Sequence, residues 1–173
     1  ANSYIYALFL PYALPICLKR KVCSFPIRII TFIFVMKQQI ILMKNILVIG
    51  AGRSSSSMIR YFLQNAEKEN WFIRVGDMNL ELAQEKVDGS KHGAAFKFNA
   101  LQAEERWAEL QGKDLVVSML PAHLHVEVVK DCIKLGINII TPSYVSPEMK
   151  ALDAAAKEAG ILVMNEIGVD PGM

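Results

Sequence analysis

A short apolar run in this sequence ends in two closely spaced glycines, Gly50 and Gly52. The run, residues 46–49, has the composition of a strand that is buried on both faces. Glycines at the end of such a strand permit a sharp turn and let a phosphate group approach the backbone. A helix that starts there adds free N–H groups and a partial positive charge. A GxG pattern alone is a weak signal, but in this position it indicates a turn that binds nucleotide phosphates.

Four serines, Ser54–Ser57, follow the turn, and Ser55 occupies the place of the third glycine in the usual GxGxxG pattern. Their hydroxyls either donate to phosphate or cap the helix, and the sequence leaves both possibilities open. The residues expected to contact the phosphates are Gly50, Gly52, Arg53, Ser54 and Ser55.

Asp77 stands after a second apolar run, Trp71–Val75, and lies 25 residues beyond Gly52. An acidic side chain at this place can accept hydrogen bonds from the adenosine ribose, although the usual spacing is ~20 residues. An ionised carboxylate would repel a 2′-phosphate, so we expect NAD as the cofactor. NADP is possible because Arg53 or Arg74 could hold that phosphate. The alternative is that Asp77 is a plain turn residue.

The turn that carries Asp77 and the turns after the next two apolar runs are expected to line the cofactor path. Met78 and Asn99 follow the second and third apolar runs, where Asn99 could meet the adenine edge. Met119 and Leu120 end the fourth run, where the middle and the nicotinamide half of a dinucleotide pass.

His123 and His125 come directly after this fourth run and suggest a catalytic pair. Residues two apart on a helix do not face the same way, however. We therefore interpret both as surface or capping histidines.

These turns need a sheet that brings them together. From Met43 onward, apolar runs alternate with segments of helical period, which predicts a parallel sheet with helices on both faces. With right-handed crossovers this is a doubly wound α/β fold of the Rossmann type with about six strands. The expected strands are 44–49, 71–75, 94–98, 114–120, 137–140 and 161–164, and the expected helices are 54–65, 79–87, 103–110, about 126–136 and 146–159.

The bulk composition agrees with one nucleotide-binding domain. The 173 residues carry a net charge of +2, so no basic field indicates a nucleic-acid partner. The three cysteines form no CxxC pair, which argues against a disulfide framework or a metal site. Cys132 falls within a predicted helix and is interpreted as a buried free thiol, which fits a reducing cytoplasm.

Residues 1–42 differ from the rest: they are apolar and aromatic and contain no Asp or Glu. Their apolar stretches, Tyr4–Leu18 and Ile27–Val35, are shorter than the ~20 residues of a membrane-spanning helix. We expect this segment to be spurious upstream translation or an unrelated leader, with a membrane anchor as the alternative. Residues 43–173 form the expected dinucleotide-binding domain, with no membrane contact of their own.

Four motifs carry a resemblance to a known family. They are Val48-Ile49-Gly50-Ala51-Gly52, Ser118-Met119-Leu120-Pro121, and the pair formed by Ser143-Tyr144-Val145-Ser146 and Asn165-Glu166-Ile167-Gly168-Val169-Asp170-Pro171-Gly172. From Met43 to the last residue the sequence resembles the saccharopine dehydrogenase family. The resemblance implies an oxidoreductase of lysine metabolism, which transfers hydride between a nicotinamide cofactor and a secondary-amine C–N bond. It also implies a small amino-acid substrate and a homodimeric full-length enzyme.

The resemblance further assigns roles near the carboxyl end of the chain. Ser143 and Tyr144 match substrate-contacting positions, and Asp170 matches an acidic position that binds the substrate or moves a proton. Gly168 and Val169 match a cofactor-contacting turn. Asp170 could instead belong to an ordinary Asp-Pro-Gly turn, and Tyr144 could be a packing aromatic.

One departure from the family bears on activity. The Ile-Asp-His continuation that normally leads into the substrate and dimerisation domain is absent, so we expect a truncated fragment that is inactive alone. A carboxynorspermidine synthase-like polyamine enzyme and a non-catalytic nucleotide-binding module are the alternatives.

Overall fold

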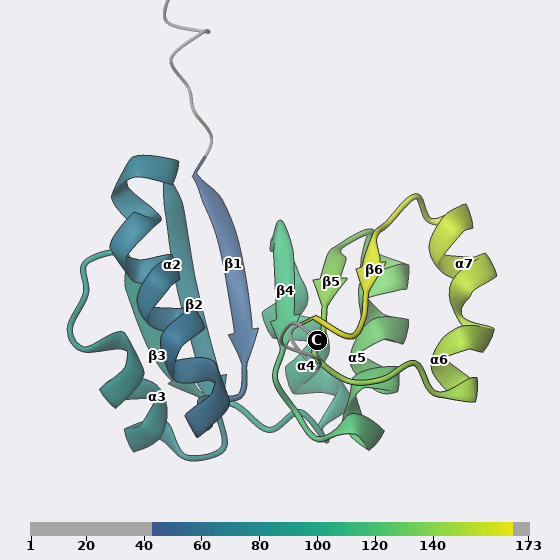
Figure 1. Ribbon diagram of the computed structural model, residues 1–173, viewed down its shortest axis with the longest axis horizontal. Helices are drawn as coiled ribbons and strands as arrows, with labels where there is room; N and C mark the ends of the chain where they lie inside the picture. The colour runs from purple at the N-terminus through teal and green to yellow at the C-terminus, as the bar shows by residue number, and fades with distance from the viewer. Residues whose placement is uncertain (1–42, 168–173) are drawn as a thin grey trace, which may run out of the picture. The chain divides into compact units, whose positions relative to one another are not determined.

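The computed structural model describes residues 43–167, and within them six parallel strands form one sheet in the order β3-β2-β1-β4-β5-β6 (Figure 1). The chain order reverses at β1, which pairs with both β2 and β4. All strands run the same way, so their carboxyl ends share one edge, at the bottom of Figure 1. This confirms the predicted doubly wound parallel sheet. The strands are β1 (Lys44–Ile49), β2 (Trp71–Asp77), β3 (Gly93–Lys97), β4 (Leu115–Ser118), β5 (Asn138–Ile140) and β6 (Val163–Met164).

Strand β1 is apolar along most of its length because its side chains enter two separate cores. Ile46 and Val48 belong to one cluster of buried residues, and Leu47 and Ile49 belong to another. Successive side chains of a strand point to opposite faces, so the two clusters lie on opposite faces of the sheet.

Helices cover both faces of the sheet, as predicted. The core that contains Ile46 also contains Ile59 of α2 and Ala83 of α3, whereas the other core contains Leu110 of α4 and Val128 of α5. Helices α6 and α7 follow β5 and lie beyond β6 at one end of the sheet (Figure 1). The helices are η1 (Arg53–Ser55, a 3-10 turn), α2 (Ser56–Glu69), α3 (Leu80–Val87), α4 (Ala103–Leu110), α5 (Ala122–Leu135), α6 (Pro147–Ala151) and α7 (Asp153–Glu158).

The ends of the helices follow from individual residues. The Asn79 side chain accepts the N–H groups of Glu81 and Leu82 and so starts α3. Gly136 adopts a left-handed conformation with φ of 69° and ends α5, as the sequence predicts. These caps set where each helix returns to the sheet and hence where the next strand begins.

Several predicted elements have other bounds than those observed, and two of the differences have a clear local cause. The single helix expected over residues 146–159 is divided into α6 and α7 at Leu152, whose N–H donates to the Met149 carbonyl three residues back. Such a bond tightens the turn to 3-10 geometry and interrupts the regular α-helix. Strand β4 stops at Ser118 rather than at residue 120, because Pro121 directs the chain into α5.

Cys132 is a free and buried thiol, as predicted, and lies in the core beneath α5. Burial raises the pKa of this thiol to about 12, so the group is held in its neutral form. Among residues 43–167, no helix has the length and apolarity needed to cross a bilayer. The predicted leader, residues 1–42, lies outside the described residues, as do residues 168–173.

A buried ion pair joins α4 to α5 on one face of the sheet. Arg106 donates from Nε to the Asp131 carboxylate at 2.8 Å and from Nη1 to the Ala100 carbonyl at 2.7 Å. Both charged side chains are almost fully buried, with residue exposures of 5% and 8%. The guanidinium therefore ties the loop after β3 to two helices.

We expect Arg106→Met to lower the free energy of unfolding by about 3–5 kcal/mol, because it leaves the buried carboxylate of Asp131 without its partner. Urea denaturation followed by circular dichroism measures the loss. Lys157→Met is the control, since it breaks the exposed Lys157–Asp153 pair and should cost less than about 1 kcal/mol. Equal losses of unfolding free energy in the two variants would show that the buried ion pair stabilises the fold no more than the exposed one.

Candidate nucleotide-binding site

The two glycines of the turn after β1 are required for different reasons. Gly50 has φ of 104°, and a Cβ atom there would lie 2.9 Å from the Met119 carbonyl oxygen. The fold itself therefore demands glycine at this position. Gly52 has an ordinary φ of −64°, and a Cβ atom added to it would meet nothing within 4 Å. The space beside Gly52 is thus open for a ligand.

Asp77, at the end of β2, holds the glycine turn in place. One oxygen of its carboxylate accepts the Ala51 N–H at 2.6 Å, and the other accepts the Asn79 N–H at 2.8 Å. The negative charge is thereby placed beside the turn at the carboxyl edge of the sheet. Asp77 acts as a turn residue in this structure, and its contact with a ribose stays a prediction.

Ser55 is fully buried, and its hydroxyl donates to the Gly52 carbonyl at 2.8 Å. It replaces the third glycine of the usual pattern by bracing the turn from inside. No serine side chain makes a capping hydrogen bond at the start of η1 or α2. Arg53 and Ser54 are exposed beside the turn, where they can reach a bound anion.

A pocket of about 240 Å³ opens at the carboxyl edge, beside the glycine turn. It brings together residues from the turns after β1, β2, β3 and β4. Its walls are mostly apolar, which suits a flat aromatic base. Among the predicted cofactor residues it contains Gly50, Asp77, Met78, Asn99 and Leu120, and it is completed by Ile49, Gly76, Phe98, Ala100, Leu101, Pro121 and Leu124.

Asn99 shapes one wall of this pocket by organising the loop before α4. Its side-chain oxygen accepts the Leu101 N–H at 3.1 Å, and its own N–H donates to the Glu105 carboxylate at 3.0 Å. Met119 packs against the core that contains Ile46 and Val48, while its carbonyl faces Gly50.

A second polar group lies along the same edge and centres on His125. The His125 Nδ1 atom is 2.8 Å from the Ser118 hydroxyl, and its Nε2 atom is 2.8 Å from the Ser143 hydroxyl. The imidazole is fully buried. Burial lowers the pKa of His125, and the nearby His123 lowers it further. Both effects favour the neutral form of the imidazole.

The interpretation of His125 as a surface or capping residue is wrong, whereas His123 is exposed as expected. The sequence contains a signal that identifies the difference. His125 shares a helical stripe with Val128, Val129 and Cys132, all of them fully buried. A histidine on the apolar stripe of a helix faces the sheet and needs polar partners there.

The loop that carries Ser143 and Tyr144 is tied to the loop after β6. The Ser143 carbonyl accepts the Glu166 N–H at 3.1 Å, and the Val145 N–H donates to the Glu166 carboxylate at 3.1 Å. Tyr144 is 72% exposed, so it is not a packing aromatic within the described residues. The predicted residues Gly168, Val169 and Asp170 lie outside residues 43–167.

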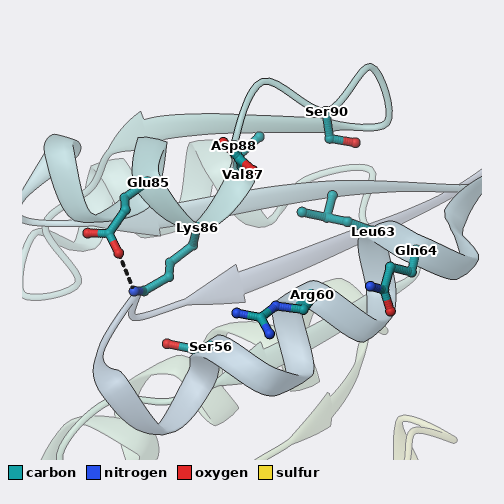
Figure 2. Close-up of a pocket in the computed structure, with 9 residues that line it drawn as sticks. All are labelled: Ser56, Arg60, Leu63, Gln64, Glu85, Lys86, Val87, Asp88 and Ser90. Atoms are coloured by element: carbon teal, nitrogen blue, oxygen red, sulfur yellow. Dashed lines mark hydrogen bonds and ion pairs between the residues drawn. The ribbon is translucent and has the colours of Figure 1, made fainter.

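Another groove, of about 490 Å³, lies between α2 and α3 (Figure 2). Figure 2 shows Arg60 and Lys86 on its facing walls, with Lys86 paired to Glu85 at 2.9 Å. Of the serines considered as phosphate donors only Ser56 lines it, and none of the other predicted cofactor or substrate residues does. The sheet edge, rather than this groove, is therefore the candidate site.

The fold and the glycine turn define a Rossmann-type nucleotide-binding domain. Within that class, the chain belongs to the saccharopine dehydrogenase NADP binding domain family, whose pattern matches residues 46–164.

The chain is 35% identical over 130 residues to the NADP(+), L-glutamate-forming saccharopine dehydrogenase of Pyricularia oryzae, covering 75% of this chain and 28% of the relative. It is 37% identical over 133 residues to the mitochondrial alpha-aminoadipic semialdehyde synthase of Bos taurus, covering 75% and 14%. The apo structure of the L-Glu-forming saccharopine dehydrogenase from Saccharomyces cerevisiae matches with a TM-score of 0.67 at 32% identity, covering 75% and 28%. The chain thus spans about a quarter or less of the length of these relatives.

The roles of Gly50 and Gly52 can be tested separately by experiment. Gly50→Ala should destabilise the fold by about 1–3 kcal/mol, because alanine at φ of 104° is strained and its Cβ meets the Met119 carbonyl. Gly52→Ala should change stability by less than about 0.5 kcal/mol but weaken NADPH binding, because its methyl group occupies the open space. Urea unfolding and NADPH fluorescence titration measure the two effects. Unchanged NADPH affinity in Gly52→Ala would show that this turn does not contact the bound nucleotide.

Proposed function

We propose that this chain is the nicotinamide-nucleotide-binding part of a saccharopine dehydrogenase-like oxidoreductase. The observation that carries the proposal is the pocket of about 240 Å³ beside Gly50, because it gathers residues of four turns at the edge where parallel sheets bind ligands. The proposed reaction is hydride transfer at a secondary-amine C–N bond of an amino-acid substrate, as the family resemblance implies. The relative from Pyricularia oryzae is named as a saccharopine dehydrogenase that uses NADP(+) and forms L-glutamate.

The chemistry of the site fits a dinucleotide. The N–H groups at the start of η1 and the open space at Gly52 suit the pyrophosphate. The apolar walls formed by Met78 and Phe98 suit the adenine. Met119 and Leu120 follow β4, which pairs with the strand that precedes the Ser143 loop. They suit the nicotinamide half, which supplies or accepts the hydride when bound.

The choice between NAD and NADP depends on the charge near the ribose. The Asp77 carboxylate favours NAD, whereas the names of the family and of its fungal relatives specify NADP. Arg74 is engaged elsewhere, since it pairs with Glu109 at 2.8 Å and stacks over Phe96. Of the two arginines considered for this role, Arg53 is the one whose side chain is exposed beside the glycine turn. We propose binding of NAD(P), with Asp77 shifting the preference towards NAD.

Fluorescence titration with NADH and NADPH tests this preference. We expect tighter binding of NADH, and we expect Asp77→Asn to narrow the difference about fivefold or more, since a unit charge at ~4 Å contributes about 1 kcal/mol even in water. Asparagine keeps an oxygen that can accept the Ala51 N–H, but its NH2 group cannot accept the Asn79 N–H. Urea unfolding of the variant therefore separates a weakened turn from the loss of charge.

Asp88→Asn, at the far end of α3, is the matched control and should leave both affinities unchanged. Tighter binding of NADPH by the unaltered chain would show that Asp77 does not discriminate against the 2′-phosphate.

The oxidoreductase activity belongs to the longer relatives, of which this chain spans at most 28% in the comparisons above. We expect no saccharopine oxidation from the 173-residue chain alone, and NADPH or NADH formation from a longer polypeptide that carries it. Absorbance at the reduced nicotinamide band measures both. Nucleotide binding without turnover in the longer polypeptide would favour a non-catalytic module, and turnover of a carboxynorspermidine-type substrate would favour the polyamine enzyme.

Two further properties belong to this proposal. The complete enzyme is proposed to be a homodimer, on the strength of the family resemblance alone. A cytoplasmic location is proposed because Cys132 is kept as a free thiol in the core.

A further inference from the structure

The hydrogen bonds of His125 restrict where its proton lies. A neutral imidazole has one donor nitrogen and one acceptor nitrogen. Nδ1 contacts the Ser118 hydroxyl and Nε2 contacts the Ser143 hydroxyl, so one serine donates to the ring and the other accepts from it. Two arrangements are possible, and they leave Ser143 with opposite polarity towards a ligand.

Ser118 decides between the two arrangements. It is fully buried, and among residues 43–167 its hydroxyl has His125 as its hydrogen-bond partner. If Nδ1 carried the proton, Ser118 would accept it, and its own O–H would be a buried donor without an acceptor. If Nδ1 is unprotonated, Ser118 donates to it, and only the acceptor lone pairs of its oxygen stay unused. A buried orphan donor is rarer than an under-used acceptor, so the second arrangement is favoured.

The position of the His125 proton determines the direction of the Ser143 hydroxyl. With the proton on Nε2, His125 donates to the Ser143 oxygen at 2.8 Å, and the Ser143 O–H must point elsewhere. Ser143 is only partly buried, unlike Ser118, so its hydrogen can reach a ligand at the carboxyl edge. Its backbone is held as well, since its N–H donates to the Thr141 hydroxyl and its carbonyl accepts from Glu166.

We propose that His125 is a positioning residue that makes Ser143 an obligatory hydrogen-bond donor to a carboxylate of the amino-acid substrate. The substrate part of this inference rests on the proposed function. A hydroxyl that already accepts from an N–H is polarised to donate, and a carboxylate oxygen is the anionic acceptor that an amino acid offers. The hydrogen bond from Ser118 keeps the His125 proton on Nε2. The Nε2–H group then donates to the Ser143 oxygen, which leaves the Ser143 O–H free to donate to the substrate.

The tautomer is measured directly on the 173-residue chain by two-bond ¹⁵N–¹H correlation of its histidine rings. We expect His125 to show a protonated Nε2 and an unprotonated Nδ1. Ser143→Ala should keep this pattern because the Ser118 donor remains, whereas Ser118→Ala should weaken or reverse it. A protonated Nδ1 in the unaltered chain overturns the inference without touching the proposed function.

The substrate contact is measured in the longer polypeptide by steady-state kinetics with saccharopine. Ser143→Ala and His125→Phe should raise the KM for saccharopine about ten- to hundredfold while the KM for the nicotinamide cofactor stays the same. His125→Gln, whose amide can donate in place of Nε2, should recover part of the loss, as should Ser143→Thr. Urea unfolding of each variant separates misfolding from a lost contact.

The outcomes are distinguishable. Equal KM values for Ser143→Ala and the unaltered enzyme, or a rise shared by the cofactor, overturn the role of Ser143 as a donor to the substrate. Absence of saccharopine turnover in the unaltered longer polypeptide overturns the proposed function and the assignment of the carboxylate, while the tautomer measurement still decides the state of His125.

Discussion

The structure depends on the burial of β1 from both sides. The strand pairs with β2 on one edge and β4 on the other, and its side chains enter both cores. Every backbone group of such a strand needs a neighbouring strand, and every side chain needs a covering helix. Once β1 is central, the chain order must reverse beside it, and the turn after β1 opens at the edge where ligands bind.

At that edge, some residue types are required by the fold, whereas others are left open to contact a ligand. Gly50 is dictated by the close approach of the Met119 carbonyl, and Ser55 by its bond to Gly52 inside the turn. Gly52 takes part in the turn only through its backbone carbonyl, so its lack of a side chain is not demanded by the fold, and Arg53 is exposed. Asp77 joins the two sets, because its carboxylate braces the turn and places a negative charge next to the open space. The same residue thus braces the turn and carries the charge on which the proposed cofactor preference depends.

The polar chain from Ser118 to Ser143 links two buried side chains to a partly buried one. Three side chains from β4, α5 and the loop after β5 meet in one line of hydrogen bonds. Each bond is ordinary in length, but the burial of Ser118 and His125 removes water as an alternative partner. Tautomer and hydroxyl direction are then properties of the whole chain of bonds rather than of one residue.

The sequence by itself determined the alternation of strands and helices, the glycine turn, and the side of the sheet on which Asp77 and Ser143 lie, because these follow from local periodicity and from parallel topology. It did not determine the break at Leu152 or the partners of Asp77, which depend on how neighbouring turns pack. The burial of His125 was readable from its stripe with Val128 and Cys132, yet its two serine partners were not. Only the tertiary structure decided that Ser118 and Ser143, distant in the chain, meet on one imidazole, because hydrogen bonds between loops arise from packing rather than from local sequence.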